Sequence, residues 1–211
     1  MQFEVLFFDL DDTLYPPNTG LWEAIRNRIE KYLIEVMKFP PEIAPVLQKE
    51  LFIKHGTTLR GLEEEYQVDA QEYLDFVHDV PLTDYLKPDP VLKRILSHYP
   101  QRKVIFTNAD SGHANRVINA LGLTGCIDKI IDVRDIHPYC KPQVAAFQKA
   151  LLLAGIEKPQ KCVMIDDTWR NLLSAKKVGM STIQIGTQER NDGVDAAILT
   201  LSELPEILPA E

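Results

Sequence analysis

Three short apolar runs, each followed by a polar and chemically active residue, constrain the fold of this chain most. They are Val5–Phe8 before Asp9, Val104–Phe106 before Thr107, and Val163–Ile165 before Asp166. Such runs are typical of buried strands in a parallel sheet. Because ligands bind outside the carboxyl ends of such strands, the polar residues are predicted to meet in one site.

The order of the remaining patterns predicts an α/β fold. From residue 89 onward, helical patterns alternate with strands that are expected at 103–106, 129–133, 162–165 and 182–185. Strands separated by helices of this length need crossover connections. We therefore expect a Rossmann-like parallel sheet with helices on both faces.

Residues 16–88 differ from the rest, because the patterns found there are helical. Two apolar sets recur at helical spacing: Leu21, Ile25, Ile29, Leu33 and Val36, and then Ile43, Val46, Leu47, Leu51 and Phe52. Each set is expected to form the buried face of a helix. The predicted organisation is a core of residues 1–15 and 89–211, with an all-helical domain of residues 16–88 inserted after the first strand.

Charge and composition exclude several classes of partner. The formal net charge is −8, whereas binding to nucleic acid or to an anionic membrane needs clustered Lys and Arg. The N-terminal residues lack the basic segment of a signal peptide, and no apolar run is long enough to span a membrane. Three cysteines without C-x-x-C spacing predict neither disulfides nor a zinc site and fit a cytoplasmic protein. No pattern indicates an oligomeric state.

Two acidic pairs suggest a metal. Asp9 and Asp11 follow the first apolar run, and Asp166 and Asp167 lie at the end of a later one. Carboxylates gathered in one pocket repel one another unless a cation or a proton compensates. Mg²⁺ is the expected ion, because it takes oxygen ligands and is usually held by one or two carboxylates together with a substrate phosphate.

Other polar residues complete a predicted phosphate-transfer site. Thr107 offers a hydroxyl to phosphate oxygens with Asn108 beside it, and Lys141 offers positive charge. Asn171, one helical turn beyond Asp167, either orients the carboxylates or is an ordinary exposed helix residue. Each short motif alone occurs often by chance. Their occurrence together at strand and helix ends indicates one catalytic site.

These motifs resemble those of the haloacid dehalogenase-like hydrolases. Asp9-x-Asp11-x-Thr13 is similar to motif I, Thr107 to motif II, Lys141 to motif III and Asp166-Asp167 to the Asp-Asp form of motif IV. The helical insertion is similar to the family's C1 cap. The resemblance implies that Asp9 is the nucleophile that forms an aspartyl-phosphate and that Asp11 is the general acid and base.

The same resemblance implies the metal ligands and the reaction class. Mg²⁺ would be held by the Asp9 side chain, the Asp11 carbonyl oxygen and Asp166, with Asp167 nearby. Family members that displace halide typically lack the second aspartate of motif I. Asp11 and Thr13 are both present here, which favours hydrolysis of a phosphate ester.

The insertion is expected to select the leaving group. The segments Thr13-Leu14-Tyr15-Pro16 and Gly56-Thr57-Thr58 resemble the pyrimidine 5′-nucleotidase branch, which implies a nucleotide such as UMP or CMP. Asn108, His55, Thr57 and Thr58 are accordingly the predicted substrate-binding residues. The alternatives are that Thr57 and Thr58 are helix N-caps and that His55 is a charge at a helix C-terminus.

Other functions stay open at this point. A phosphatase of sugar phosphates or of pyridoxal phosphate, a phosphomutase, and a catalytically silent nucleotide-binding protein would share much of the core. Tyr15 and Trp22 could stack on a base, or they could belong to the core of the insertion. A phosphorylation-driven receiver domain is disfavoured, because a second acidic pair follows Lys141 and a large insertion separates the first two strands.

Overall fold

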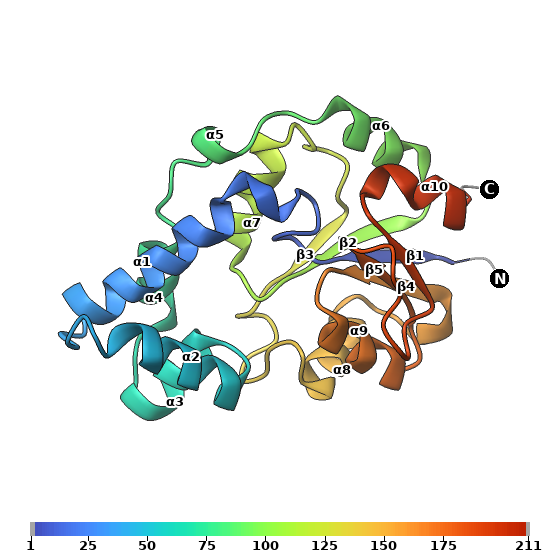
Figure 1. The fold of residues 1–211 in the computed structure, drawn as a ribbon. Coiled ribbons are helices and arrows are strands. Elements are labelled where there is room, and N and C mark those ends of the chain that lie inside the picture. Colours follow the sequence, from blue (N-terminus) through green and yellow to red (C-terminus); the bar gives the residue numbers. More distant parts are fainter. Residues whose placement is uncertain (1–2, 210–211) are drawn as a thin grey trace.

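A computed structural model describes residues 3–209. Within them, six parallel strands form one sheet in the order β3-β2-β1-β4-β5-β6 (Figure 1). The strands are β1 (Val5–Phe8), β2 (Arg102–Phe106), β3 (Lys129–Ile131), β4 (Cys162–Asp166), β5 (Ser181–Ile185) and β6 (Ala196–Ile198). The predicted α/β fold with a parallel sheet is confirmed. The short edge strand β6 was missed, because two of its three residues are alanines, which are depleted in strands.

Helices cover both faces of the sheet. They are α6 (Pro90–His98), α7 (Ser111–Ala120), α8 (Val144–Leu153), α9 (Trp169–Lys177) and the short α10 (Leu204–Ile207). Because successive side chains of a strand point to opposite faces, β1 serves both layers. Leu6 and Phe8 pack in the layer that contains α6 and α7, while Val5 and Phe7 pack against α8 and α9.

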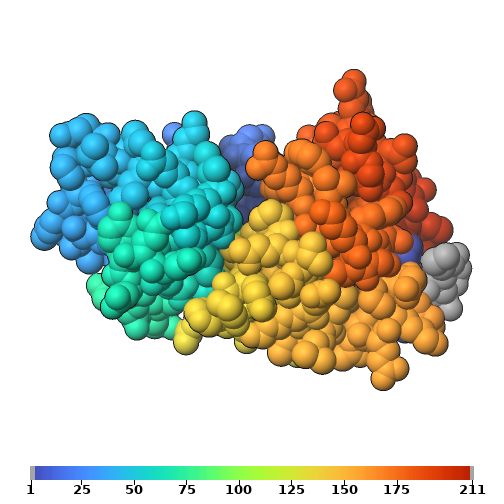
Figure 2. Space-filling model, turned by 90° about the horizontal axis from the view of Figure 1, so that it is seen from below, coloured from blue at the N-terminus to red at the C-terminus, as the bar shows by residue number. Residues whose placement is uncertain are grey.

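Every regular element between β1 and α6 is helical. A 3-10 helix (Pro17–Thr19) leads into α1 (Leu21–Glu35), α2 (Ala44–His55), α3 (Thr58–Tyr66), α4 (Ala70–Val77) and the short α5 (Leu82–Tyr85). Figure 2 shows that α1 to α4 lie at one end of the molecule and border the segment that precedes α8. The division into two domains at residues 16–88 stays a prediction.

The predicted buried face of the second helix was partly wrong. Ile43, Val46 and Phe52 are 45%, 54% and 53% exposed, whereas Leu51 is buried. Apolar residues occur around this helix on all sides, so their spacing alone could not select the face that packs. Contacts with the neighbouring helices make that selection.

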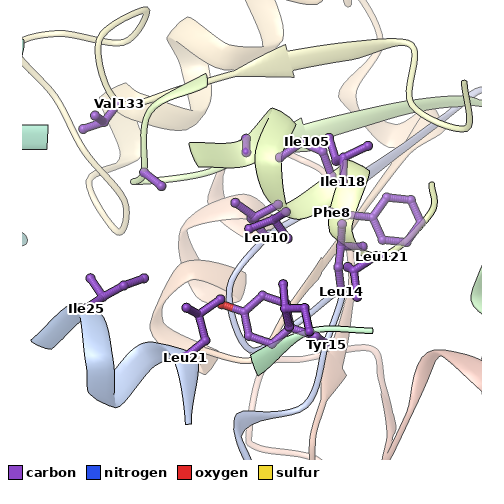
Figure 3. Packing of buried hydrophobic residues seen from close by; sticks show 14 of the residues in the cluster. Phe8, Leu10, Leu14, Tyr15, Leu21, Ile25, Ile105, Ile118, Leu121 and Val133 are labelled. Atoms are coloured by element: carbon purple, nitrogen blue, oxygen red, sulfur yellow. The ribbon is translucent and has the colours of Figure 1, made fainter. Parts of the chain in front are cut away.

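The first connection from the sheet to the helices is itself part of the core. Figure 3 shows Leu10, Leu14 and Tyr15 between the sheet and Leu21 of α1, and all four residues are buried. Tyr15 is therefore a core residue with no free ring face for a base. In residues 3–209, no helix is long and apolar enough to cross a membrane.

Candidate active site

The sheet topology brings two acidic segments together. Strands β1 and β4 are neighbours, but the chain leaves β1 toward β2 and leaves β4 toward β5. A ligand crevice forms where such connections diverge. Asp9 follows β1, and its N–H donates to the Ile165 carbonyl at 2.9 Å. Asp166 is the last residue of β4, so both aspartates lie at this crevice.

Three carboxylates converge there around one lysine. Asp9, Asp166 and Asp167 each contribute an oxygen to a group whose members lie within 4.8 Å of one another. Lys141 Nζ lies 2.7 Å from Asp9 Oδ1 and 2.9 Å from Asp166 Oδ2. Lys141 is 2% exposed and Asp166 is completely buried. One cation thus faces three carboxylates.

The charge in this group is not balanced. Burial raises the pKa of Asp9 well above its usual range, even though Lys141 acts in the opposite direction. Burial and the neighbouring Asp166 also raise the pKa of Asp167 to about 6. A second cation would stabilise the ionised form of these buried, closely spaced carboxylates. Their oxygen ligands fit Mg²⁺.

Two asparagines hold this group in place. Asn108 donates to the Lys141 carbonyl at 3.0 Å and accepts from the Lys141 N–H at 2.9 Å. Asn171 donates to both carboxylate oxygens of Asp166, at 2.9 and 3.0 Å. Asn171 is buried and orients a carboxylate, which was one of the two sequence interpretations. The predicted contact of Asn108 with substrate stays a prediction.

Thr107 lies at the same edge of the sheet, immediately after β2. Its side chain is buried, and its Oγ1 accepts a hydrogen bond from the Ala109 N–H at 3.0 Å. The hydroxyl hydrogen is thereby left to donate to another group, which fits the predicted contact with a phosphate oxygen.

The hydrogen-bond partners of the Asp11 carboxylate lie outside the group of Asp9, Asp166 and Asp167. Its Oδ1 accepts from the Tyr15 hydroxyl at 2.6 Å and lies 3.0 Å from His113 Nε2. Burial alone would raise the pKa of Asp11, but His113 and the Tyr15 hydrogen bond outweigh burial and lower it. The arrangement therefore favours an ionised carboxylate, anchored through one of its two oxygens.

The turn before α3 packs against the Lys141 segment. Gly56 has a φ of +91°, and a Cβ there would lie 2.8 Å from Cys140 Sγ, so a side chain does not fit. Cys140 Sγ also donates to the His55 carbonyl at 3.3 Å. Residues 55 and 56 thus lie beside the loop that carries Lys141.

The polar atoms of that turn have partners within the helical segment. His55 lies between Glu64 and Glu65, at 3.0 and 2.7 Å. Thr57 caps α3 by accepting from the Arg60 N–H, and the Thr58 hydroxyl donates to the Gln48 carbonyl. The N-cap alternative for Thr57 is confirmed. Substrate binding by His55, Thr57 and Thr58 stays a prediction.

Sequence reasoning missed two important residues. Arg60 is buried and donates to the Tyr139 carbonyl at 3.0 Å, which ties α3 to the loop before Lys141. His113 donates to Asp11 from α7. Neither could be found from local patterns, because their partners are 79 and 102 positions away in the chain.

The sequence profile of the haloacid dehalogenase-like hydrolases matches residues 3–179. This chain belongs to that family. The predicted membership of the family is therefore confirmed, whereas the roles of the individual motif residues stay predictions.

Two curated relatives have names that refer to phosphate or to a phosphatase. Phosphate metabolism protein 8 of Saccharomyces cerevisiae is 29% identical over 194 residues, which cover 85% of this chain but 60% of the yeast protein. The chain thus spans less than two thirds of that relative. Glyceraldehyde 3-phosphate phosphatase of Pyrococcus furiosus is 26% identical over 231 aligned positions, which cover 100% of this chain and 95% of the archaeal protein.

Solved structures share the fold. A HAD phosphatase from Thermococcus onnurineus superposes with a TM-score of 0.63 at 21% identity, over 100% of this chain and 99% of the other. The HAD-hydrolase YfnB from Bacillus subtilis, solved with bound magnesium, gives 0.66 at 17% identity, over 99% of both chains. At these identities the likeness concerns the fold alone.

Proposed function

We propose that this protein is a Mg²⁺-dependent phosphomonoester hydrolase that acts through an aspartyl-phosphate. The observation that carries the proposal is the group at the crevice, where Asp9 lies 2.7 Å from Lys141 beside Asp166 and Asp167. It combines a nucleophilic carboxylate, a fixed cation and further oxygen ligands. Two relatives whose names refer to phosphate or to a phosphatase support it.

The metal would bind beside the nucleophile. Its proposed ligands are the side chains of Asp9 and Asp166 and the carbonyl oxygen of Asp11, with Asp167 close by. When bound, Mg²⁺ supplies positive charge that neutralises the ligands and the phosphate oxygens. Lys141 supplies further positive charge at the same place, because its ammonium group already contacts Asp9 and Asp166.

The side chains account for both chemical steps. The Asp9 carboxylate attacks phosphorus, and the bond from phosphorus to the ester oxygen breaks. Asp11, whose hydrogen bonds favour the ionised form, takes up a proton when the anionic phosphate of the substrate binds beside it, and it gives that proton to the departing alcohol. Asp11, now ionised, then takes a proton from the water that attacks the aspartyl-phosphate. Inorganic phosphate leaves and the Asp9 carboxylate is restored. Thr107 and Lys141 contact the phosphate oxygens in both steps.

The proposed substrate is a small phosphorylated metabolite, and a pyrimidine nucleoside 5′-monophosphate is the first candidate. The segments 13–16 and 56–58 support it, and the second lies against the Lys141 loop. The insertion at 16–88 would act as the cap that contacts the leaving group. A sugar phosphate is the second candidate, favoured by the name of the Pyrococcus relative.

Phosphate release from a panel of esters tests the proposal. The panel contains UMP, CMP, AMP, glyceraldehyde 3-phosphate, a hexose phosphate and pyridoxal phosphate, each with Mg²⁺ and with EDTA. We expect release that EDTA abolishes, with UMP or CMP preferred. Preference for another ester would keep the mechanism and reject the nucleotide assignment. Absence of release from every ester would contradict the hydrolase and favour a silent nucleotide-binding protein.

Asp11→Asn is expected to separate esters by their leaving groups. An amide cannot supply the proton, so kcat/KM for alkyl phosphates should fall about 10²- to 10⁴-fold, the usual contribution of general acid catalysis. The loss for 4-nitrophenyl phosphate should be smaller, because nitrophenolate leaves without a proton.

Asp12→Asn is the matched control, because Asp12 lies in the same turn with a φ of +56°, which asparagine tolerates. That variant should show no dependence on the leaving group. An equal loss on alkyl and aryl esters in Asp11→Asn would count against its role as the acid.

A further inference from the structure

The side chain of His113 is completely buried, and among residues 3–209 its one hydrogen-bond partner is Asp11. Nε2 lies 3.0 Å from Asp11 Oδ1. Because an ionised carboxylate only accepts, Nε2 carries the hydrogen and donates it. Nδ1 has no hydrogen-bond partner within residues 3–209. A buried nitrogen without a partner costs stability, so packing alone does not account for a histidine here.

A second histidine, from the helical segment, holds this ring in place. The ring of His78 stacks on that of His113, with centroids 4.3 Å apart and an angle of 19° between the planes. His78 follows α4, and its Nδ1 pairs with the Asp110 carboxylate. Asp110 also accepts from the His113 N–H at 2.9 Å, as the N-cap of α7. The stack therefore joins the insertion to α7.

The other connection of the insertion reaches the same carboxylate oxygen. Tyr15, between β1 and the 3-10 helix, donates to Asp11 Oδ1 at 2.6 Å. Two donors on Oδ1 fix the plane and direction of the carboxylate. No hydrogen bond with another part of residues 3–209 occupies Oδ2, so this oxygen is free to carry the transferred proton.

We propose that His113 is a positioning residue for Asp11, and that His78 acts through His113 by holding its ring. Asp11 is thereby oriented by Tyr15, directly before the inserted segment, and through His113 by His78, which follows α4 within that segment. The same contacts then fix both the position of the insertion and the direction in which Asp11 presents its proton. This inference rests on the proposed hydrolase, because it needs Asp11 as the acid.

Two substitutions of His113 separate its hydrogen bond from its ring. His113→Phe keeps a ring for the stack with His78 but has no donor. His113→Gln places an N–H near the position of Nε2 but has no ring. For His113→Phe, we expect kcat/KM for alkyl phosphates to fall about ten- to a hundredfold more than for 4-nitrophenyl phosphate, because a hydrogen bond to a charged group is lost. His113→Gln should recover most of the difference.

Further variants test the contribution of the stack. His78→Leu removes the ring behind His113 and should give the same dependence on the leaving group, to a smaller extent. Tyr15→Phe removes the other donor and should act in the same direction. His98→Phe is the matched control, because His98 is exposed on α6, and should change neither class of ester. Thermal unfolding of each variant identifies any that do not fold.

The outcomes distinguish this inference from the proposed function. Equal losses on alkyl and aryl esters in His113→Phe, without recovery in His113→Gln, would show a purely structural role and overturn the inference. Unchanged kinetics in His113→Phe would overturn it too. If His113→Phe does not fold, uniform losses in His78→Leu and Tyr15→Phe would have the same meaning. Absence of phosphate release by the unmodified protein would instead contradict the proposed hydrolase.

Discussion

Asp9→Asn is expected to lower the rate of phosphate release from every ester by at least about 10⁴-fold, because removal of a covalent nucleophile leaves only binding and charge stabilisation. A carboxamide has nearly the shape of the carboxylate, and its oxygen can still accept from Lys141, so the fold should survive. The measurement is phosphate release with Mg²⁺ over long incubation. In addition, acid quenching during turnover should trap a phosphorylated peptide containing Asp9 in the unmodified protein and not in the variant.

Asp192→Asn serves as the control for this experiment, because Asp192 is exposed in the loop between β5 and β6. It should retain full activity. Deamidation would regenerate aspartate at position 9, so the mass of the Asp9→Asn protein is measured before and after the assay. Mg²⁺-dependent turnover by a variant of intact mass would contradict the assignment of Asp9 as the nucleophile.

Lys141→Met is expected to cause the second largest effect, on both activity and stability. Methionine keeps an apolar stem but leaves Asp9 and Asp166 without their shared cation, which lies within 2.9 Å of both. Breaking a buried ion pair costs about 3–5 kcal/mol. The free energy of unfolding should fall by about that amount, and kcat/KM should fall at least about 10²-fold, because positive charge beside the phosphate is lost.

The stability loss should depend on pH and on the metal. In the variant, the uncompensated carboxylates bind protons more readily when folded than when unfolded. The unfolded state then binds fewer protons, so stability falls as pH rises through their raised pKa values, and the deficit shrinks at low pH. Mg²⁺ should stabilise the variant more than the unmodified protein, since a more negative site binds a cation more tightly. Urea unfolding at several pH values, with and without Mg²⁺, measures both effects.

Lys103→Met is the matched control for a buried lysine. Lys103 is 8% exposed, and its ammonium donates to the carbonyls of Tyr99 and Gln101 rather than to carboxylates. This variant should lose stability without any added response to Mg²⁺ and should keep its activity. The same response to Mg²⁺ in both variants would mean that Lys141 does not balance a metal-binding group.

Much of the core could be predicted because burial on both faces requires apolar strands. β1, β2 and β4 are such runs, and the polar residues that follow them must lie at one edge of a parallel sheet. Asp9, Thr107 and Asp166 were found in this way. The exposed side of α2 could not be predicted, because this helix carries apolar side chains on all sides. Packing against the neighbouring helices determines which side is buried.

The sequence by itself determined the parallel α/β fold and which residue types gather at the strand ends, because hydrophobic periodicity and strand polarity are local properties. Only the tertiary structure decided that Asn108 holds the Lys141 backbone and that His113 donates to Asp11. Those contacts join residues 33 and 102 positions apart. They depend on how helices pack and which rotamers fit, and no local pattern encodes either.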